Sequence, residues 1–179
     1  VYDCVILGSG PAGLTAAIYA ARACLTALVI EKEFVSGGQV VDTSEVDNYP
    51  GYPGISGFEL GMKFREHAER LGVEFINDEI ENIDIEGKEK KALTVSGKEY
   101  TGRTLILAAG AVHRKLEVPG EQDLAGMGVS YCATCDGAFF KGKTVAVVGG
   151  GDVAIEDALF LSKGCEKVYL IHRRDSLRG

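Results

Sequence analysis

The sequence has no excess of basic residues. It contains 26 Asp and Glu against 19 Lys and Arg, which gives a formal net charge of -7 at pH 7. No segment forms a basic stripe that would compensate for this balance. Because nucleic acids and anionic membranes attract positive protein surfaces, the charge argues against either as a partner.

Long hydrophobic runs are also missing. The longest apolar region, residues 14–30, is interrupted by Arg22 and Thr26 and follows a glycine turn. A membrane-spanning helix needs about 20 consecutive apolar residues, and a secretory signal needs an uninterrupted apolar core. We therefore expect no membrane segment, no secretory signal and a cytoplasmic protein.

Cysteine is scarce and irregularly spaced. Five cysteines in 179 residues are too few for a disulfide scaffold, and an odd number in a reducing compartment favours free thiols or thiol chemistry. Cys132 and Cys135 form the only CxxC pair, whereas a zinc site would need two more ligands at suitable spacing. The other cysteines and the histidines are scattered along the chain: Cys4, Cys24, Cys165, His67, His113 and His172. We therefore expect no metal site.

Glycine, in contrast, is abundant. Its 24 copies gather where apolar runs end, and this rhythm of strand, tight turn and helix is typical of an α/β nucleotide-binding fold. The chain opens with a predicted strand at 2–7, followed by a glycine turn and an alanine-rich helix at 11–23. A second strand is predicted at 27–30 and ends at Glu31.

The next segments complete a first domain that is expected to end at about residue 112. Residues 37–57 are rich in Gly, Pro, Asp and Asn, and we interpret them as a ligand-contacting loop, because long loops in compact domains are usually functional. Apolar spacing predicts an amphipathic helix at 57–71. Alternating apolar residues predict antiparallel strands within 79–87 and 91–100, and a strand at 104–110 returns to the parallel sheet.

A second domain repeats this pattern. Residues 118–121, VPGE, look like a boundary, because Pro and Gly fix a turn there. After the cysteine pair come a predicted strand at 143–150, a helix at 152–163 and a strand at 167–172. The predicted fold class is therefore α/β, with two Rossmann-like dinucleotide-binding domains.

Glycine motifs mark the two strand-to-helix turns. The first has GxGxxG spacing and the second GxGxxA spacing: Gly8, Gly10 and Gly13, then Gly149, Gly151 and Ala154. The first glycine makes the tight turn, the second lets a pyrophosphate approach the backbone, and the third position lets the helix pack close to the strand. Each copy follows a strand and starts a helix, which makes the signal specific. For either copy alone, a purely structural turn is the alternative.

The residues that end the second strand of each unit differ in charge. Glu31 and His172 each lie 23 positions after the first glycine of their motif. Glu31 can accept hydrogen bonds from ribose hydroxyls and repels a 2′-phosphate. His172 is followed by Arg173 and Arg174, whose guanidinium groups can clamp a phosphate. The contrast favours NADPH over NADH at the second motif, with a solvated basic edge as the alternative.

We interpret Cys132 and Cys135 as a redox dithiol. A thiolate in a CxxC pair commonly has a lowered pKa and exchanges readily with another dithiol. Asp136 follows directly and could shuttle the proton that accompanies opening of the disulfide, or could cap the next turn. Two dinucleotides beside a dithiol suggest an electron path from NADPH to flavin, from flavin to the cysteine pair, and from there to a partner.

Five segments together resemble a known family: GSGPAGLTAAIYAARA, GGQ, CATCDG, VVGGGDVA and HRR. In this order and over nearly the whole chain, they resemble low-molecular-weight thioredoxin reductases of the bacterial and archaeal type. The resemblance implies a homodimer that uses FAD and NADPH to reduce thioredoxin or a thioredoxin-like protein. It also implies that Cys135 faces the flavin, that Cys132 attacks the disulfide of thioredoxin, and that Asp136 is the acid/base.

The resemblance further implies the cofactor contacts. Those to FAD would be made by Gly8, Ser9, Gly10, Pro11, Ala12, Gly13, Glu31, Gly37, Gly38, Gln39, Asn48, Ala109 and Gly110. Those to NADPH would be made by Gly149, Gly150, Gly151, Asp152, Val153, Ala154, His172, Arg173 and Arg174. Residues 1–112 would then be the FAD-binding domain, and residues 113–179 the NADPH-binding domain that carries the CxxC pair. Because the family continues beyond this point, we expect the chain to be an N-terminal portion with a truncated second domain.

Nicotinamide and disulfide would compete for the same flavin face. We therefore hypothesise that the second domain turns about residues 118–121 to present them alternately. Three other functions remain open. A ferredoxin-dependent flavin disulfide reductase should lack the second glycine turn and the arginines, and an enzyme of a peroxidase system should carry a thioredoxin-like domain. A non-catalytic dinucleotide-binding redox sensor would use Cys132 and Cys135 only as a switch.

Overall fold

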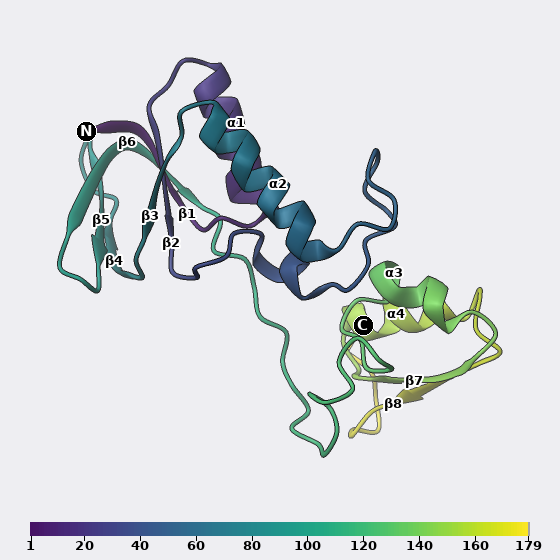
Figure 1. Cartoon of the computed structure of the whole chain (residues 1–179). Coiled ribbons are helices and arrows are strands. Elements are labelled where there is room, and N and C mark those ends of the chain that lie inside the picture. Colours follow the sequence, from purple (N-terminus) through teal and green to yellow (C-terminus); the bar gives the residue numbers. More distant parts are fainter. Residues whose placement is uncertain (179) are drawn as a thin grey trace. The chain divides into compact units, whose positions relative to one another are not determined.

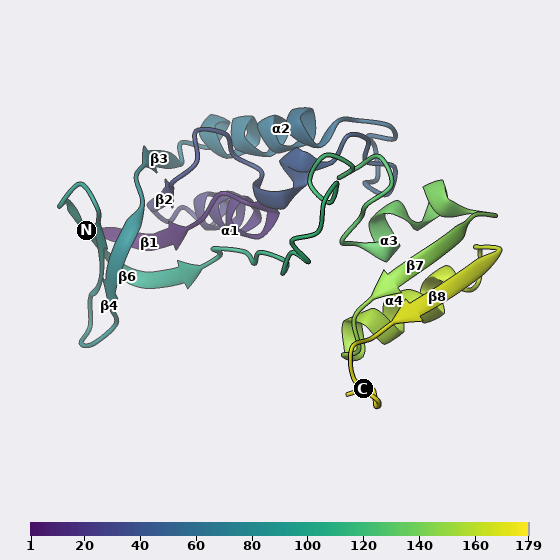
Figure 2. The same cartoon turned by 90° about the horizontal axis from the view of Figure 1, so that it is seen from below.

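The computed structural model describes residues 1–178 and forms two compact units, Val1–Val112 and His113–Gly179. Figure 1 shows the elements of each unit, and Figure 2 shows them turned by 90°. The sequence suggested domains at 1–112 and 113–179 with a connector at residues 118–121, and this connector lies within the second unit. In the described residues, no helix has the length and apolarity needed to cross a membrane.

A six-stranded sheet forms the centre of the first unit, with strand order β3-β2-β1-β6-β5-β4. The strands are β1 Tyr2–Leu7, β2 Ala27–Glu31, β3 Glu74–Asn77, β4 Ile80–Asp84, β5 Lys90–Thr94 and β6 Glu99–Leu107. The strands β3, β2, β1 and β6 pair in parallel, whereas β5 pairs antiparallel with both β4 and β6. In this register Val5 lies opposite Leu28 on one side and Leu105 on the other.

Both faces of the central strands are covered, which explains their unbroken apolar sequences. Two helices cover one face, as Figure 1 shows: α1 Pro11–Arg22 and α2 Gly57–Arg70. On this face Ile6 packs with Leu14 of α1 and Ala68 of α2, and all three are fully buried. On the opposite face Val5 packs with Ala92 of β5. Removal of these apolar side chains from water stabilises the layers and holds the carboxyl ends of β1 and β2 in place.

Most predicted elements of the first unit are confirmed, and two differ. The strand predicted at 104–110 is part of a longer strand, β6, which starts at Glu99 and ends at Leu107. Up to Gly102 this strand pairs antiparallel with β5, and from Gly102 onward it pairs parallel with β1. Strand β3 was not predicted, because only Phe75 and Ile76 are apolar in its four residues.

The loop predicted at 37–57 is mostly irregular. It contains one short 3-10 helix, η1 Gly38–Asp42, and one isolated bridge between Val46 and Ile55. Ser56 then caps α2, because its side chain accepts a hydrogen bond from the Glu59 N–H at 3.2 Å. The loop is thereby attached at its end to a rigid helix.

The second unit contains a β-α-β arrangement preceded by short helices. Its elements are α3 Ala133–Asp136, η2 Gly137–Phe140, β7 Thr144–Val148, α4 Asp152–Leu161 and β8 Lys167–Ile171. The strands β7 and β8 pair in parallel, with Val148 opposite Ile171. A strand, a turn, a helix and a parallel strand follow one another as predicted, although α4 ends two residues before the predicted end at 163.

Candidate functional site

The first glycine turn joins β1 to α1 and is required by the packing of the chain. Gly8 has a φ of +104°, and a Cβ there would lie 2.3 Å from the Ala108 carbonyl oxygen. A Cβ on Gly13 would lie 2.0 Å from the Gly8 carbonyl oxygen. Neither position can therefore take a side chain without a backbone shift. The Gly8 N–H donates to the Ile30 carbonyl at 2.9 Å, which fixes the turn to the end of β2.

Gly10 differs, because the chain itself gives no steric reason for a glycine. Its φ of -70° suits any residue, and a Cβ would come no closer than 3.9 Å to an atom beyond its chain neighbours. Gly10 is the N-cap of α1, no side chain caps this end, and the first turn, which starts with Pro11 and Ala12, has no acidic residue. Free N–H groups at a helix N-terminus attract anions. This space therefore fits the pyrophosphate of a dinucleotide.

Glu31 ends β2 and contacts the glycine turn. Its Oε2 accepts hydrogen bonds from the Ser9 N–H at 2.7 Å and the Ser9 hydroxyl at 2.8 Å, and its Oε1 accepts from the Glu33 N–H at 3.0 Å. Ser9 is fully buried. An ionised carboxylate can accept about four hydrogen bonds, so Glu31 keeps room for one further donor, such as a ribose hydroxyl.

The loop that follows β2 also reaches the glycine turn. The Gly37 N–H donates to the Ser9 carbonyl at 2.9 Å. A Cβ on Gly38 would lie 3.2 Å from the Cα of Gly10, and Gly38 has a φ of +57°. The structure thus brings Gly37 and Gly38 beside Ser9 and Gly10, and a side chain on Gly38 would narrow the space at the turn.

The segment after β6 also lies beside the first glycine turn. The Gln39 side-chain amide donates to the Ala111 carbonyl. The Cα of Ala109 lies 3.3 Å from the position of a Cβ on Gly8, and Gly110 has a φ of +70°. Asn48 lies on an exposed bend, and in the described part of the chain no hydrogen bond joins it to the turn. Of the residues suggested for FAD, Asn48 alone neither contacts the residues of the turn nor lies next to a residue that does, within the described part of the chain.

Cys132 and Cys135 form a disulfide in the second unit, with an S–S distance of 2.10 Å. Cys132 is the N-cap of α3, and its Sγ accepts a hydrogen bond from the Cys135 N–H at 3.2 Å. Thr134 Oγ1 lies 3.4 Å from the same sulfur. Both neighbours can donate to a negatively charged sulfur and would stabilise a thiolate on Cys132 when the disulfide opens. Cys135 is the more exposed of the two.

Ser130 holds the acid that follows the cysteine pair. Its hydroxyl donates to Asp136 Oδ2 at 2.5 Å and accepts a hydrogen bond from the Cys132 N–H at 3.1 Å. The Asp136 N–H also donates to the Cys132 carbonyl at 3.1 Å. The carboxylate of Asp136 is therefore fixed to the Cys132 backbone through a single hydroxyl. Ser130 was not among the predicted site residues, although its place two residues before the CxxC pair could have indicated a role.

The second glycine turn repeats the first in its essentials. Gly149 has a φ of +153°, its N–H donates to the Ile171 carbonyl at 3.0 Å, and a Cβ there would lie 2.7 Å from the Cβ of Ala154. A Cβ on Gly150 would lie 2.2 Å from Nδ1 of His172. Gly151 has no atom within 4 Å of such a Cβ, and like Gly10 it is a helix N-cap without a side-chain cap. A ligand can approach the backbone at this glycine.

The segment after β8 folds back on this turn. The Arg178 N–H donates to the Gly150 carbonyl at 2.7 Å, and His172 Nε2 lies 3.1 Å from the Ser176 carbonyl. Arg173 and Arg174 are exposed, and within residues 1–178 neither forms an ion pair. Arg178 was not among the predicted site residues, because only this backbone hydrogen bond shows that it lies next to the glycine turn.

The first turn of α4 contains the remaining residues suggested for NADPH. Asp152 and Val153 are both exposed at the N-terminus of this helix. Asp152 places a carboxylate close to the free N–H groups, which it stabilises electrostatically. The same carboxylate would repel a phosphate that approached these N–H groups.

Residues 1–178 contain no group of three His, Cys, Asp or Glu side chains that could hold a metal ion. The three cysteines outside the disulfide are Cys4, Cys24 and Cys165. Cys4 is buried in β1, and burial raises the pKa of its thiol. Its position is that of a small core residue.

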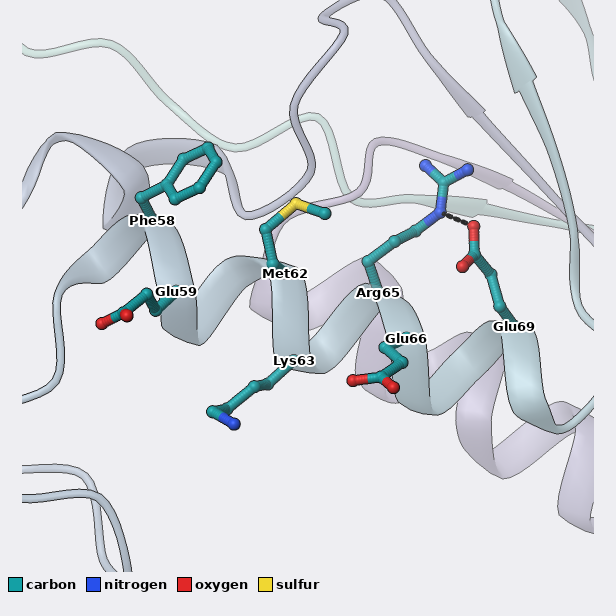
Figure 3. Close-up of a pocket in the computed structure, with 7 residues that line it drawn as sticks. All are labelled: Phe58, Glu59, Met62, Lys63, Arg65, Glu66 and Glu69. Atoms are coloured by element: carbon teal, nitrogen blue, oxygen red, sulfur yellow. Dashed lines mark hydrogen bonds and ion pairs between the residues drawn. The ribbon is translucent and has the colours of Figure 1, made fainter.

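One surface hollow of about 400 Å³ lies along α2, as Figure 3 shows. It is lined by Phe58, Glu59, Met62, Lys63, Arg65, Glu66 and Glu69. All of these residues belong to one helix, and Arg65 is paired with Glu69 at 2.6 Å. None of them was suggested as a cofactor contact, and a hollow built by one helix face does not enclose a dinucleotide.

Comparison with known proteins gives consistent results. Thioredoxin reductase of Bacillus subtilis (strain 168) is 51% identical over 179 residues, which is all of this chain and 56% of that protein. The crystal structure of thioredoxin reductase from Streptococcus pyogenes MGAS5005 is 49% identical with a TM-score of 0.91, over 99% of this chain and 57% of that one. The Lactococcus lactis thioredoxin reductase in its FR conformation is also 49% identical but has a TM-score of 0.64, over 99% of this chain and 58% of that one.

These similarities confirm the predicted resemblance and the α/β fold with Rossmann-type units. The chain spans a little over half the length of the relatives that it matches. The family model for pyridine nucleotide-disulphide oxidoreductases matches residues 2–178, nearly the complete sequence. The chain therefore belongs to the pyridine nucleotide-disulphide oxidoreductase family.

Proposed function

We propose that the full-length protein is a flavoprotein disulfide reductase that passes electrons from NADPH through FAD and the Cys132–Cys135 disulfide to thioredoxin. The observation that carries this proposal is the presence, in one chain, of a CxxC disulfide and two glycine turns, each with one glycine on which a Cβ would meet no atom beyond its chain neighbours closer than 3.9 Å. The similarity to thioredoxin reductases supports the choice of thioredoxin as the partner.

We assign FAD to residues 1–112. Gly10 and the N-terminus of α1 would hold the pyrophosphate, Glu31 would accept from the ribose, and the segments at Gly37–Gln39 and Ala109–Gly110 would line the flavin end. We assign NADPH to residues 113–179, where Gly151 and the N-terminus of α4 would meet the pyrophosphate. Arg173 and Arg174 would bind the 2′-phosphate. When both cofactors are bound, FAD accepts hydride from NADPH and supplies two electrons to a disulfide.

The cysteines then carry out thiol–disulfide exchange. Two electrons break the Cys132–Cys135 bond, and the thiolate of Cys132 attacks one sulfur of the thioredoxin disulfide to form a mixed disulfide. The thiolate of Cys135 attacks Cys132, restores the internal bond and releases thioredoxin as a dithiol. Asp136, held by Ser130, would supply the proton that the leaving sulfur of thioredoxin takes up.

A turning second domain is part of this proposal. The two relatives that share 49% identity differ in TM-score, 0.91 against 0.64, which supports more than one arrangement in this family. We place the pivot at the division between the two units, about residues 112–113, and not at residues 118–121, because Glu121 accepts hydrogen bonds from the Leu116 and Glu117 N–H groups within the second unit. Cross-linking the two domains of the full-length protein should abolish NADPH-dependent turnover, and unchanged turnover would contradict the pivot.

The homodimer and the cytoplasmic location are proposals that rest on the resemblance and on the composition. Sedimentation of the full-length protein at several concentrations would test the dimer. Cell fractionation would test the location.

The decisive experiment uses the visible spectrum of the full-length protein. A reductase should be isolated yellow, lose flavin absorbance when NADPH is added without air, and regain it on addition of oxidised thioredoxin. A colourless protein would contradict the proposal. A redox sensor, the alternative function, would show no steady NADPH consumption in the presence of thioredoxin.

A further inference from the structure

Glu121 is a buried carboxylate in the second unit, with 4% of its surface exposed. Its Oε1 accepts hydrogen bonds from the Leu116 N–H at 2.8 Å and the Tyr131 hydroxyl at 2.7 Å, and its Oε2 accepts from the Glu117 N–H at 2.6 Å. The Leu116 N–H and then the Tyr131 hydroxyl hold the pKa of this carboxyl below its usual range. A buried charge needs such compensation, so these three hydrogen bonds are needed to keep the Glu121 carboxylate in its buried position.

The donors come from two different segments. Leu116 and Glu117 belong to the stretch with which the second unit begins, whereas Tyr131 directly precedes Cys132 of the disulfide. One oxygen, Oε1, accepts from both segments. Glu121 therefore joins the start of the unit to the residue before the redox pair. Glu121 and Tyr131 are ten positions apart in the sequence, and no helix or strand lies between them.

The backbone at Glu117 supports this reading. Glu117 has a φ of +60°, a left-handed conformation that is unfavourable for a residue other than glycine. Such conformations persist when the surroundings enforce them. The surroundings here include the hydrogen bond from the Glu117 N–H to Glu121, which needs that N–H to point inward.

Tyr131 is held at its ring as well as at its hydroxyl. The ring stacks on His113, with 3.6 Å between the ring centroids and 18° between the planes. His113 is the first residue of the second unit. The ring of Tyr131 therefore contacts His113 and its hydroxyl contacts Glu121. The next residue in the chain after Tyr131 is Cys132 of the disulfide.

We propose that Glu121 and Tyr131 are positioning residues for the Cys132–Cys135 disulfide, which they fix to residues 113–117 so that the start of the unit and the redox pair move as one body. This inference rests on the proposed reductase function for its consequence in catalysis. If the connection were lost, the disulfide could change its position independently of the rest of the unit, and its reduction by flavin would slow. Reduction of flavin by NADPH does not involve the disulfide and would be unaffected.

The test uses the full-length holoprotein with Tyr131→Phe, Glu121→Gln and the double variant. Tyr131→Phe keeps the ring on His113 and removes only the hydroxyl. Glu121→Gln keeps the shape of the side chain but replaces one accepting oxygen with an NH₂ group, which cannot accept a hydrogen bond from the backbone N–H groups of Leu116 and Glu117. Tyr169→Phe is the matched control, because Tyr169 is a half-exposed tyrosine of β8 whose hydroxyl makes no hydrogen bond within residues 1–178.

Two measurements are made on each variant. Hydrogen exchange of peptides that cover residues 113–117 and 130–136 should accelerate in Tyr131→Phe and Glu121→Gln and remain unchanged in Tyr169→Phe. In rapid mixing, flavin reduction by NADPH should keep its rate, while electron transfer to the disulfide slows by about fivefold. The double variant should be no slower than the slower single variant, because both substitutions break the same connection.

The outcomes separate this inference from the proposed function. Unchanged exchange in Tyr131→Phe, or losses that multiply in the double variant, would overturn the positioning role even in an active reductase. Accelerated exchange in a protein that reduces no thioredoxin would leave the connection in place and contradict only the proposed function. Equal slowing of both electron-transfer steps would show a general loss of structure and would also overturn the positioning role.

Discussion

At Gly10 and Gly151 the space around the residue indicates why a glycine is there. At Gly8 and Gly13 a Cβ would collide with the protein's own backbone, whereas at Gly10 and Gly151 it would meet nothing closer than 3.9 Å. The chain's own packing explains the first kind of glycine but leaves the second unexplained. The second kind lies at a helix N-terminus in both units, so a ligand that approaches this backbone is the simplest physical reason for a missing side chain.

This distinction predicts the effect of Gly10→Ala. The variant should fold with little change in stability, because its φ and ψ suit alanine, but its affinity for FAD should fall by about tenfold or more, about 1.4 kcal/mol. Flavin content after purification and thermal unfolding of the flavin-free protein are the measurements. Gly151→Ala is the matched control and should keep its flavin while the KM for NADPH rises. Normal FAD affinity in Gly10→Ala would mean that this turn does not hold the pyrophosphate.

Ser130 allows a second prediction at the same scale. Ser130→Ala removes the donor that fixes Asp136, and a hydrogen bond to a charged group contributes about 1.5–3 kcal/mol. The thioredoxin-dependent step should slow by about tenfold with a changed pH profile, and NADPH should reduce the flavin at the normal rate. Ser130→Thr retains a hydroxyl and should restore most of the activity. Equal loss in the alanine and threonine variants would point to packing instead of proton transfer.

At the level of elements, the sequence predicted what depends on local pattern and missed what depends on distant partners. The apolar runs of β1 and β2, the amphipathic helix α2 and the turn–helix–strand repeat of the second unit were all predictable from residue spacing. The four residues of β3 have too few apolar side chains to form a pattern, and they form a strand because β2 offers a free edge to pair with. The two-way pairing of β6 could not be read either, since it requires β1 and β5 on opposite sides.

The site was predictable to a similar extent. The glycine motifs and the CxxC pair are recognised from the spacing of a few neighbouring residues, so they could be identified before the fold was known. The Ser130–Asp136 and Glu121–Tyr131 contacts need a folded loop before they exist. The return of Arg178 to the second glycine turn is likewise a contact over 28 residues that no spacing rule contains.

The ends of β2 and β8 lead to a prediction about cofactor choice. In the proposed function, Arg173 and Arg174 bind a phosphate that NADH lacks, while Glu31 occupies the equivalent place in the first unit. Arg173→Ala/Arg174→Ala should raise the KM for NADPH by about 10- to 100-fold, since each charged hydrogen bond contributes about 1.5–3 kcal/mol. The KM for NADH should hardly change. Steady-state kinetics with both nucleotides is the measurement, and a parallel loss with both would show that the arginines do not read the 2′-phosphate.

For the whole molecule, several carboxylates influence stability together. Asp3, Asp78 and Glu121 each have a pKa below the usual range, because they accept hydrogen bonds in the folded state. A lowered pKa contributes stability above the unfolded-state value, near pH 4, and this contribution is lost as the pH falls through the folded-state values. The molecule is therefore expected to lose stability in acid.

The acid prediction can be assigned to one residue. The thermal midpoint of the full-length protein should fall between about pH 5 and pH 3, and in Glu121→Gln it should fall less steeply, because one of the carboxylates with a lowered pKa is missing. Thermal unfolding across this range is the measurement, with Glu117→Gln as the control, since Glu117 takes part in the Glu121 contacts only through its backbone. Identical slopes in Glu121→Gln and the unsubstituted protein would contradict the assignment.

In the proposed function, the cap on α3 has a consequence for repeated catalysis. The hydrogen bond from the Cys135 N–H ends on the sulfur of Cys132, and it does not require that sulfur to be bonded to another. A negatively charged sulfur accepts such a bond more strongly than a disulfide sulfur does. The hydrogen bond at the first turn of α3 is therefore strongest when the Cys132–Cys135 bond is open and Cys132 is a thiolate. The loop can then change between its oxidised and reduced states without a rearrangement of this turn.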